Sequence, residues 1–310
     1  MNRIYALALA GAIPLHSAHA QTLQQIEHQI DSITSKQPFD YSAYTAVTRK
    51  ARTRITELIA KDSLQTAADF YLASRLAADP TGFYESRRVE HELALVALVL
   101  GHPESVKRVG MSWDGLNLSI GRGQRIGSFK RDNVVTDMDP IPAPSIVRNV
   151  FNDLPAARAR AGKTSTNAEL ERLRNDDQAD REGEIDNAKM KRMAQNDPIR
   201  RARVLDLIAA GVLATGRDFH NAALIMQHGR GVDDFRLAHE LSICAVALGD
   251  STAVWLVSRT YDRLLLNLGH RQRLNTQFGG SDGGLLPVDT TAVNDRIRRI
   301  LGSKSLPEKS

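Results

Sequence analysis

The sequence contains a single cysteine, Cys244, so no intrachain disulfide contributes to its stability. This cysteine lies in the apolar run 241–248, which favours a small buried hydrophobe over a reactive thiol. Aromatic residues make up only 5% of the chain, whereas alanine and leucine are plentiful. This composition favours helices over a β-sandwich or barrel, so we expect a mainly α protein that is stabilised by packing.

No stretch of the sequence is long and apolar enough to cross a bilayer, so we expect no transmembrane segment. The apolar run 4–15 follows the positive charge of Arg3 and precedes the small-residue pattern A-H-A at 18–20. This order is typical of a secretory signal peptide. We therefore expect residues 1–20 to be removed, with cleavage after Ala20, and the mature protein to be periplasmic or secreted; a retained anchor is the alternative.

Motifs for nucleotides, metals and covalent catalysis are also missing. AGKTS at 161–165 lacks the first glycine of a phosphate loop, and GRGQRIG at 121–127 has the wrong glycine spacing for a dinucleotide site. There is no GxSxG pattern. The net charge of +5 comes from basic residues dispersed among acids, without interleaved aromatics, which argues against nucleic-acid binding. We expect no cofactor and no metal site.

The chain instead contains an internal repeat. Three blocks of the first half match three blocks of the second: LIAKDSLQTAADFY (58–71) with LIAAGVLATGRDFH (207–220), HELALVALVLG (91–101) with HELSICAVALG (239–249), and WDGLNLSIGRGQRIGS (113–128) with YDRLLLNLGHRQRLNTQ (261–277). The offset is 149 residues between Asp69 and Asp218, and 148 between His91 and His239. A nearly constant offset over several blocks predicts two tandem copies of one helical unit of about 140 residues.

This repeat defines the expected domain organisation. The first, degenerate copy covers residues 21–154 and the second covers residues 169–303. They are joined by a linker at 155–168, where PAARARAGKTSTN is small and polar and begins with proline. Residues 304–310 are expected to be a disordered tail.

Apolar periodicity places helices along both copies, at residues 22–60, 64–80, 87–100 and 104–120 in the first. The charged stretch after the linker also favours a helix, which is expected to break before Pro198. Residues 272–278 alternate polar and apolar side chains before GGSDGG, which predicts a small β-hairpin, and the equivalent part of the first copy is a candidate for another. A final helix is expected at residues 291–301.

Comparison of the copies sorts the polar residues into two groups. Residues present in both copies suggest a shared scaffold: Asp69/Asp218, His91/His239, Glu92/Glu240, Asp114/Asp262 and Gln124/Gln272. Polar residues found only in the second copy mark where a specialised site would lie, with simple surface drift as the alternative. Gln227 and His228 replace Ala78 and Asp79, His220 replaces Tyr71, and Arg263 replaces Gly115. Zinc binding by His220 and His228 with a distant aspartate is the less favoured interpretation, because closely spaced ligands are missing.

Part of the second copy resembles an uncharacterised bacterial family, one of the domains of unknown function. Its pattern is D-Q-x-x-R, then Q-H, then D-R, then G-x-x-Q-x-Y-G-T-Q and a closing helix. The matches within about 170–302 are Asp177, Gln178, Arg181, Gln227, His228, Asp262, Arg263, Gln272, Thr276 and Gln277. Leu274-Asn275 stands where the family has Tyr-Gly. The resemblance implies no activity, but it implies that these polar residues act together.

Two hypotheses follow. The first is a binding or interaction protein for an unknown small molecule or protein, because duplicated helices joined by short turns often present concave surfaces. Its expected binding residues are Asp177, Gln178, Arg181, Gln227, His228, Asp262, Arg263, Gln272 and Gln277. The alternative is a hydrolase-type enzyme that uses His228 or His220 with Asp262 as acid and base, and glutamine and arginine side chains to position the substrate.

Overall fold

The computed structural model describes residues 18–78, 81–279 and 283–306, and over this part the protein is mainly helical, as the composition predicts. The first half contains α1 (Ala18–Thr34), α2 (Tyr41–Ala60), α3 (Ala67–Ala77), α4 (Tyr84–Val99), α5 (Ser105–Ser119), β1 (Lys130–Arg131), β2 (Val134–Val135) and α6 (Ser145–Asn152). α7 (Leu154–Ala161) follows. The second half contains α8 (Ala168–Ala179), α9 (Asn187–Ala209), α10 (Gly216–Met226), α11 (Val232–Ala247), the 3-10 turn η1 (Ser251–Ala253), α12 (Val254–Asn267) and α13 (Asp295–Ile300).

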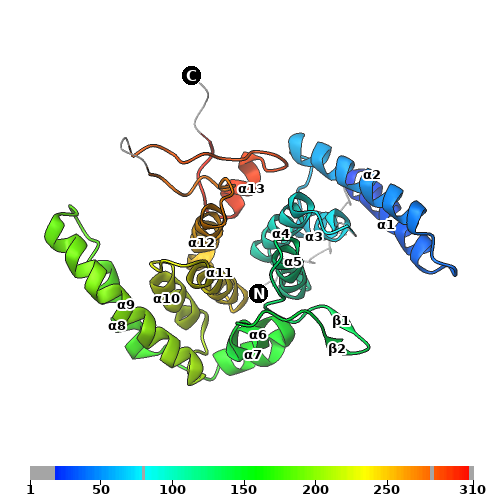
Figure 1. Ribbon diagram of the computed structural model, residues 1–310. Helices are drawn as coiled ribbons and strands as arrows, with labels where there is room; N and C mark the ends of the chain where they lie inside the picture. Colours follow the sequence, from blue (N-terminus) through cyan, green and yellow to red (C-terminus); the bar gives the residue numbers. More distant parts are fainter. Residues whose placement is uncertain (1–17, 79–80, 280–282, 307–310) are drawn as a thin grey trace, which may run out of the picture.

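The helices form an arc with a long helix pair at each end (Figure 1). α1 and α2 project at one end, α8 and α9 at the other, and α3–α5 and α10–α12 form the body between them. One hydrophobic core runs through both halves, and α4 contacts α11 at its centre. None of the helices in the described ranges is long and apolar enough to cross a membrane.

Local signals explain where the central helices begin. α3 and α10 start with the same capping box: the hydroxyl of Thr66 or Thr215 accepts from the backbone N–H of an aspartate three residues later. The carboxylates of Asp69 and Asp218 accept in return from the backbone N–H groups of Thr66 and Thr215. Both aspartates are buried, so their repeated presence is explained by helix capping.

Three sequence expectations differ from the structure. α9 continues through Pro198, because the buried side chains of Val204, Leu207 and Ile208 pack the part of the helix that follows the proline. The helix breaks earlier, between α8 and α9. The predicted linker at 155–168 contains most of α7. The final helix begins only after the cap Asn294, because the N–H of Thr291 donates to Asp289 Oδ1 instead of starting a turn.

The hairpin prediction holds only in part. Around residues 272–278 the described chain contains two isolated bridges, Gln272 with Val288 and Phe278 with Leu285, whereas the two-stranded sheet β1–β2 lies in the first half. The predicted signal peptide lies outside the described residues apart from positions 18–20, where α1 begins. Residues 307–310 of the predicted tail also lie outside them; Ser305, earlier in the tail, accepts a hydrogen bond from Asn275.

Candidate functional site

The site is centred on Asp177, a fully buried carboxylate near the end of α8. Its Oδ1 lies 3.0 Å from His228 Nδ1 and accepts from Arg181 Nη1 at 2.9 Å. Its Oδ2 accepts from Gln178 Nε2 at 2.8 Å. Since a carboxylate only accepts, His228 carries its proton on Nδ1 in this contact. Nε2 of the same ring has no hydrogen-bond partner among the described residues.

Arginine and aspartate side chains of α8, α9 and their connection form ion pairs around Asp177. Arg181 also donates to Asp197 at 2.7 Å, and Arg200 contacts both Asp197 and Asp180. Arg192 completes the cluster by contacting the second oxygen of Asp180 at 3.0 Å. Three guanidinium groups therefore match three carboxylates, and this cluster joins the end of α8 to α9 without a net charge.

Arg263 connects α12 to the same region. Its Nη1 donates to the backbone oxygen of Gln227 at 2.6 Å, next to His228, and its Nε donates to Gln277 Oε1 at 3.2 Å. Gln277 Nε2 donates in turn to the backbone oxygen of Arg259 at 3.2 Å. Burial lowers the pKa of Arg263, and the nearby charges of Arg259 and Arg181 lower it further. Arg263 thus lies beside the residue that contacts Asp177, since Gln227 precedes His228 in the chain.

Asp262 and Gln272 lie behind this site and hold its loop. Asp262 is completely buried and accepts from the backbone N–H groups of Arg273, Leu274 and Thr276 at 2.7 to 3.1 Å. Burial raises its pKa to about 6, while these hydrogen bonds oppose the shift. Gln272 Oε1 accepts from the N–H groups of Thr276 and Gln277. The expected partnership of His228 with Asp262 is thus replaced by the contact with Asp177.

His220 belongs to a separate cluster near the beginning of α10. Its Nδ1 lies 3.0 Å from Asp250 Oδ2 and 3.3 Å from Thr252 Oγ1, and its ring packs edge-on against Trp255. Burial lowers its pKa, and Asp250 opposes the shift. It makes no direct contact with the Asp177 network among the described residues, so the structure brings His228, but not His220, to the group of predicted binding residues.

The polar residues that occur in both halves form matched contacts. Asp114 accepts from the N–H groups of residues 125–128, as Asp262 does in the second half. Gln124 Oε1 accepts from the N–H of Phe129 at 2.7 Å, in the manner of Gln272. These residues therefore hold equivalent loops.

The centre of the molecule is built from the remaining matched residues, and here the two halves exchange partners. His91 and His239 lie with their Nε2 atoms 3.1 Å apart, and both are completely buried. Glu92 accepts from Arg273 Nε at 2.7 Å. Glu240 accepts from Arg125 Nε, also at 2.7 Å. The HEL segments thus lie at a helix–helix contact, and each glutamate pairs with an arginine of the other half.

Several side chains at the site were missed by sequence reasoning. Asp197 and Arg259 carry no motif, but Arg259 lies four residues after Trp255 and four before Arg263, so all three share one face of α12. Arg125 and Arg273 follow Gln124 and Gln272, and this repeated Gln-Arg pair was a signal that the copy comparison could have used.

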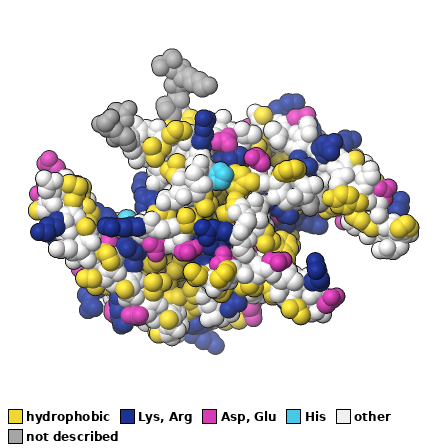
Figure 2. All heavy atoms as spheres, in the orientation of Figure 1, with side chains coloured by type: hydrophobic (Ala, Val, Ile, Leu, Met, Phe, Trp, Pro, Cys, Tyr) yellow, Lys and Arg dark blue, Asp and Glu magenta, His cyan; other side chains and the backbone are white. Residues whose placement is uncertain are grey.

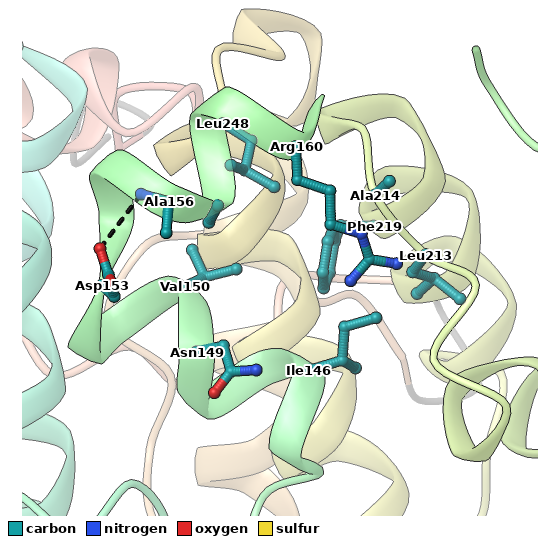
Figure 3. A pocket seen from close by; sticks show the side chains of 11 residues that line it. Ile146, Asn149, Val150, Asp153, Ala156, Arg160, Leu213, Ala214, Phe219 and Leu248 are labelled. Atoms are coloured by element: carbon teal, nitrogen blue, oxygen red, sulfur yellow. Dashed lines mark hydrogen bonds between the residues drawn. The ribbon is translucent and has the colours of Figure 1, made fainter. Parts of the chain in front are cut away.

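Figure 2 shows the surface at this place: arginine or lysine side chains and one histidine gather where the α8–α9 arm meets the body. A different cavity, of about 330 Å³, lies between α6, α7 and α10 (Figure 3). Ile146, Val150 and Phe219 give it an apolar lining, and Arg160 reaches across its mouth. None of the predicted site residues lines this cavity, and its polar groups do not converge on one point.

The described ranges contain no group of three or more histidine, cysteine, aspartate or glutamate side chains arranged to hold a metal ion. Comparisons with family models, with curated proteins and with solved structures gave no match to this chain. Its function therefore has to be inferred from the contacts described above.

Proposed function

We propose that this chain is an exported helical binding protein whose ligand site lies in its second half, between α8, α10, α12 and the loop 272–277. One observation carries the proposal. Polar residues spread over a hundred positions of sequence form one region, in which Asp177 contacts Arg181 and His228, and Arg263 contacts Gln227 and Gln277. The convergence of polar side chains from separate elements at one place on the surface argues for recognition of a ligand.

The proposal includes an ancestral duplication. It is supported by the pairs of equivalent contacts, namely the two capping boxes, the two loop-holding aspartates and the two exchanged glutamate–arginine pairs. The Asp177 network has no such counterpart: Ala78 and Gly115 occupy the positions of Gln227 and Arg263 in the first half. We infer that the first half serves as a scaffold and that recognition is restricted to the second.

Export and family membership are further parts of the proposal. Export is supported by the N-terminal pattern of residues 1–20. Membership in the domain-of-unknown-function family is supported by the fact that Asp177, Arg181, Gln227, His228 and Gln277 of its pattern lie together.

A thermal-shift screen of the purified mature protein against a metabolite library tests the binding function. A ligand of this site should raise the melting temperature of the wild type and lose most of that effect in Gln277→Leu and His228→Ala. His28→Ala, at an exposed position of α1, is the control and should respond like the wild type. If every stabilising compound acts equally on all four proteins, the site assignment is wrong.

One observation favours the enzymatic alternative. Asp177 holds His228 by Nδ1, an arrangement that orients the imidazole and leaves Nε2 to exchange a proton. In this version Asp177 takes the orienting role that the sequence assigned to Asp262. Hydrolase activity found by substrate screening should fall at least about a hundredfold in both His228→Ala and Asp177→Asn. An activity that survives both substitutions would exclude this mechanism.

A further inference from the structure

We infer that the ligand of this site carries a negatively charged carboxylate or phosphate group, held by Arg263 and Arg259. This inference rests on the proposed binding function and specifies the chemical class of its ligand. It follows from which arginine side chains of the site form ion pairs with carboxylates of the protein and which do not.

Arg263 is bonded only to neutral acceptors. Its Nη1 and Nε donate to the backbone oxygen of Gln227 and to the amide oxygen of Gln277. Its third donor group, Nη2, makes no hydrogen bond with the described residues, and no carboxylate among them forms an ion pair with this guanidinium. The carbonyl at the end of α10 supplies only the partial negative charge of a helix C-terminus. A half-buried guanidinium is thus left with most of its charge uncompensated.

The neighbouring charges increase this imbalance. Burial lowers the pKa of Arg263, and the neighbouring charges of Arg259 and Arg181 lower it further. Arg181 is satisfied by Asp177 and Asp197, but Arg259 has no ion pair with a described residue. Two unpaired guanidinium groups therefore lie beside a cluster whose own charges are balanced. A bound anion would offset this charge, and arginine forks match the planar oxygens of carboxylate and phosphate.

The face of α12 is also arranged for a ligand larger than a single ion. Trp255, Arg259 and Arg263 follow one another at intervals of four residues. The guanidinium of Arg259 lies 5.2 Å from the centre of the Trp255 ring, which holds the exposed arginine against α12. An anionic group at Arg263 would place the remainder of a small ligand along this face, toward Trp255.

The first half supplies an internal comparison at two arginines that share one carboxylate. Arg87 and Arg108 both contact the carboxylate of Glu90, which is buried in α4. At the offset of 148 residues the position of Glu90 is occupied by Ala238 in the second half. The first half therefore contains its own counter-anion, whereas the arginines of the second half have no carboxylate at the matching position.

Isothermal titration tests the inference with named probes at low salt: inorganic phosphate and glycerol 3-phosphate, succinate and citrate, and the neutral analogue glycerol. At least one anion should bind with a dissociation constant below about 1 mM, and added sodium chloride should weaken it. The phosphate and carboxylate arms distinguish the two kinds of group. Arg263→Gln should weaken binding at least about tenfold, and Arg259→Gln, which removes a charge without a protein hydrogen bond, about threefold or more.

Lys107→Gln removes an equally exposed charge from α5 at the position matched to Trp255, and it should bind like the wild type. Circular dichroism verifies that each variant is folded. The inference is overturned if no anion binds at about 10 mM, or if Arg263→Gln and Arg259→Gln leave anion binding unchanged. A neutral compound that binds and is lost in Gln277→Leu would preserve the binding function while removing the anionic ligand class.

Discussion

The exchanged glutamate–arginine pairs give the sharpest test of how the two halves are held together. Glu240 is completely inaccessible to solvent and accepts from Arg125 Nε at 2.7 Å and Nη2 at 2.8 Å. It also accepts from Trp113 Nε1 at 2.9 Å. Glu240→Gln keeps the shape of the side chain but removes its charge, which leaves the buried guanidinium of Arg125 without a counter-ion.

An uncompensated buried charge of this kind costs roughly 3 to 5 kcal/mol of unfolding free energy. The exposed pair of Arg54 and Glu57, 2.9 Å apart, provides the matched control, because Glu57→Gln should cost less than about 0.5 kcal/mol. Adding Arg125→Met to Glu240→Gln removes the orphaned charge. We expect the double variant to be more stable than Glu240→Gln alone by about 1 kcal/mol or more.

Urea unfolding is the assay, followed by tryptophan fluorescence and by far-ultraviolet circular dichroism, whose agreement verifies a single transition. The fluorescence of Trp113 reports directly on this contact. A loss below about 1 kcal/mol in Glu240→Gln would refute the reasoning, as would a double variant whose loss equals the sum of the two single losses.

Two further predictions concern titration and loop anchoring. Burial lowers the pKa of His91 and lowers that of His239 to about 3. Below the ordinary histidine pKa of about 6.5, the unfolded chain therefore binds more protons than the folded chain, and the free energy of unfolding falls as the pH falls. The raised pKa of Asp262 acts in the opposite direction, so we expect a net loss of roughly 1 to 3 kcal/mol per pH unit between about pH 6 and 4, and a smaller slope in H91Q/H239Q. Asp262→Asn should accelerate hydrogen exchange of the amides 273–276 at least about tenfold, while the amides 125–128 held by Asp114 serve as the internal control. A pH slope unchanged in H91Q/H239Q, or equal acceleration in both loops, would contradict these assignments.

The helices were largely predictable because each has a periodic apolar face and a local start signal, as the capping boxes of Thr66 and Thr215 show. The predicted helix break before Pro198 was wrong, because the tertiary packing of α9 outweighs the local free-energy cost of a proline inside a helix. The hairpin predicted around residues 272–278 is reduced to isolated bridges for a similar reason. Alternation around residues 272–278 reflects Leu274 turning into the core while the loop is held by side chains rather than by a strand ladder.

The candidate site was predictable where the two halves of the sequence differ at matched positions, and unpredictable where contacts depend on how the halves face each other. Comparison of the copies selected His228 and Arg263, which the structure places at one site. The same comparison could not show that Glu92 pairs with Arg273 instead of with Arg125 of its own half. A sequence offset fixes which residues are equivalent, but it contains no information about the symmetry that relates them.

This exchange of partners predicts a role for the first half at the proposed ligand site. Glu92 holds Arg273, whose backbone N–H binds Asp262 and which lies in the same loop as Gln277. Glu92→Gln should therefore loosen the loop 272–277, whereas Glu240→Gln, the equivalent change, disturbs the loop of the first half.

The two variants remove the same charge from equivalent buried contacts. Arg273 keeps a second carboxylate partner in Asp289 at 3.3 Å, so Glu92→Gln should lose less stability than Glu240→Gln. Hydrogen exchange at the amides 273–277 should be at least about tenfold faster in Glu92→Gln than in Glu240→Gln under conditions where both are folded. Binding of any ligand identified at Arg263 should weaken in the same order. Equal exchange in the two variants would mean that the first half contributes only to overall stability and does not position the site.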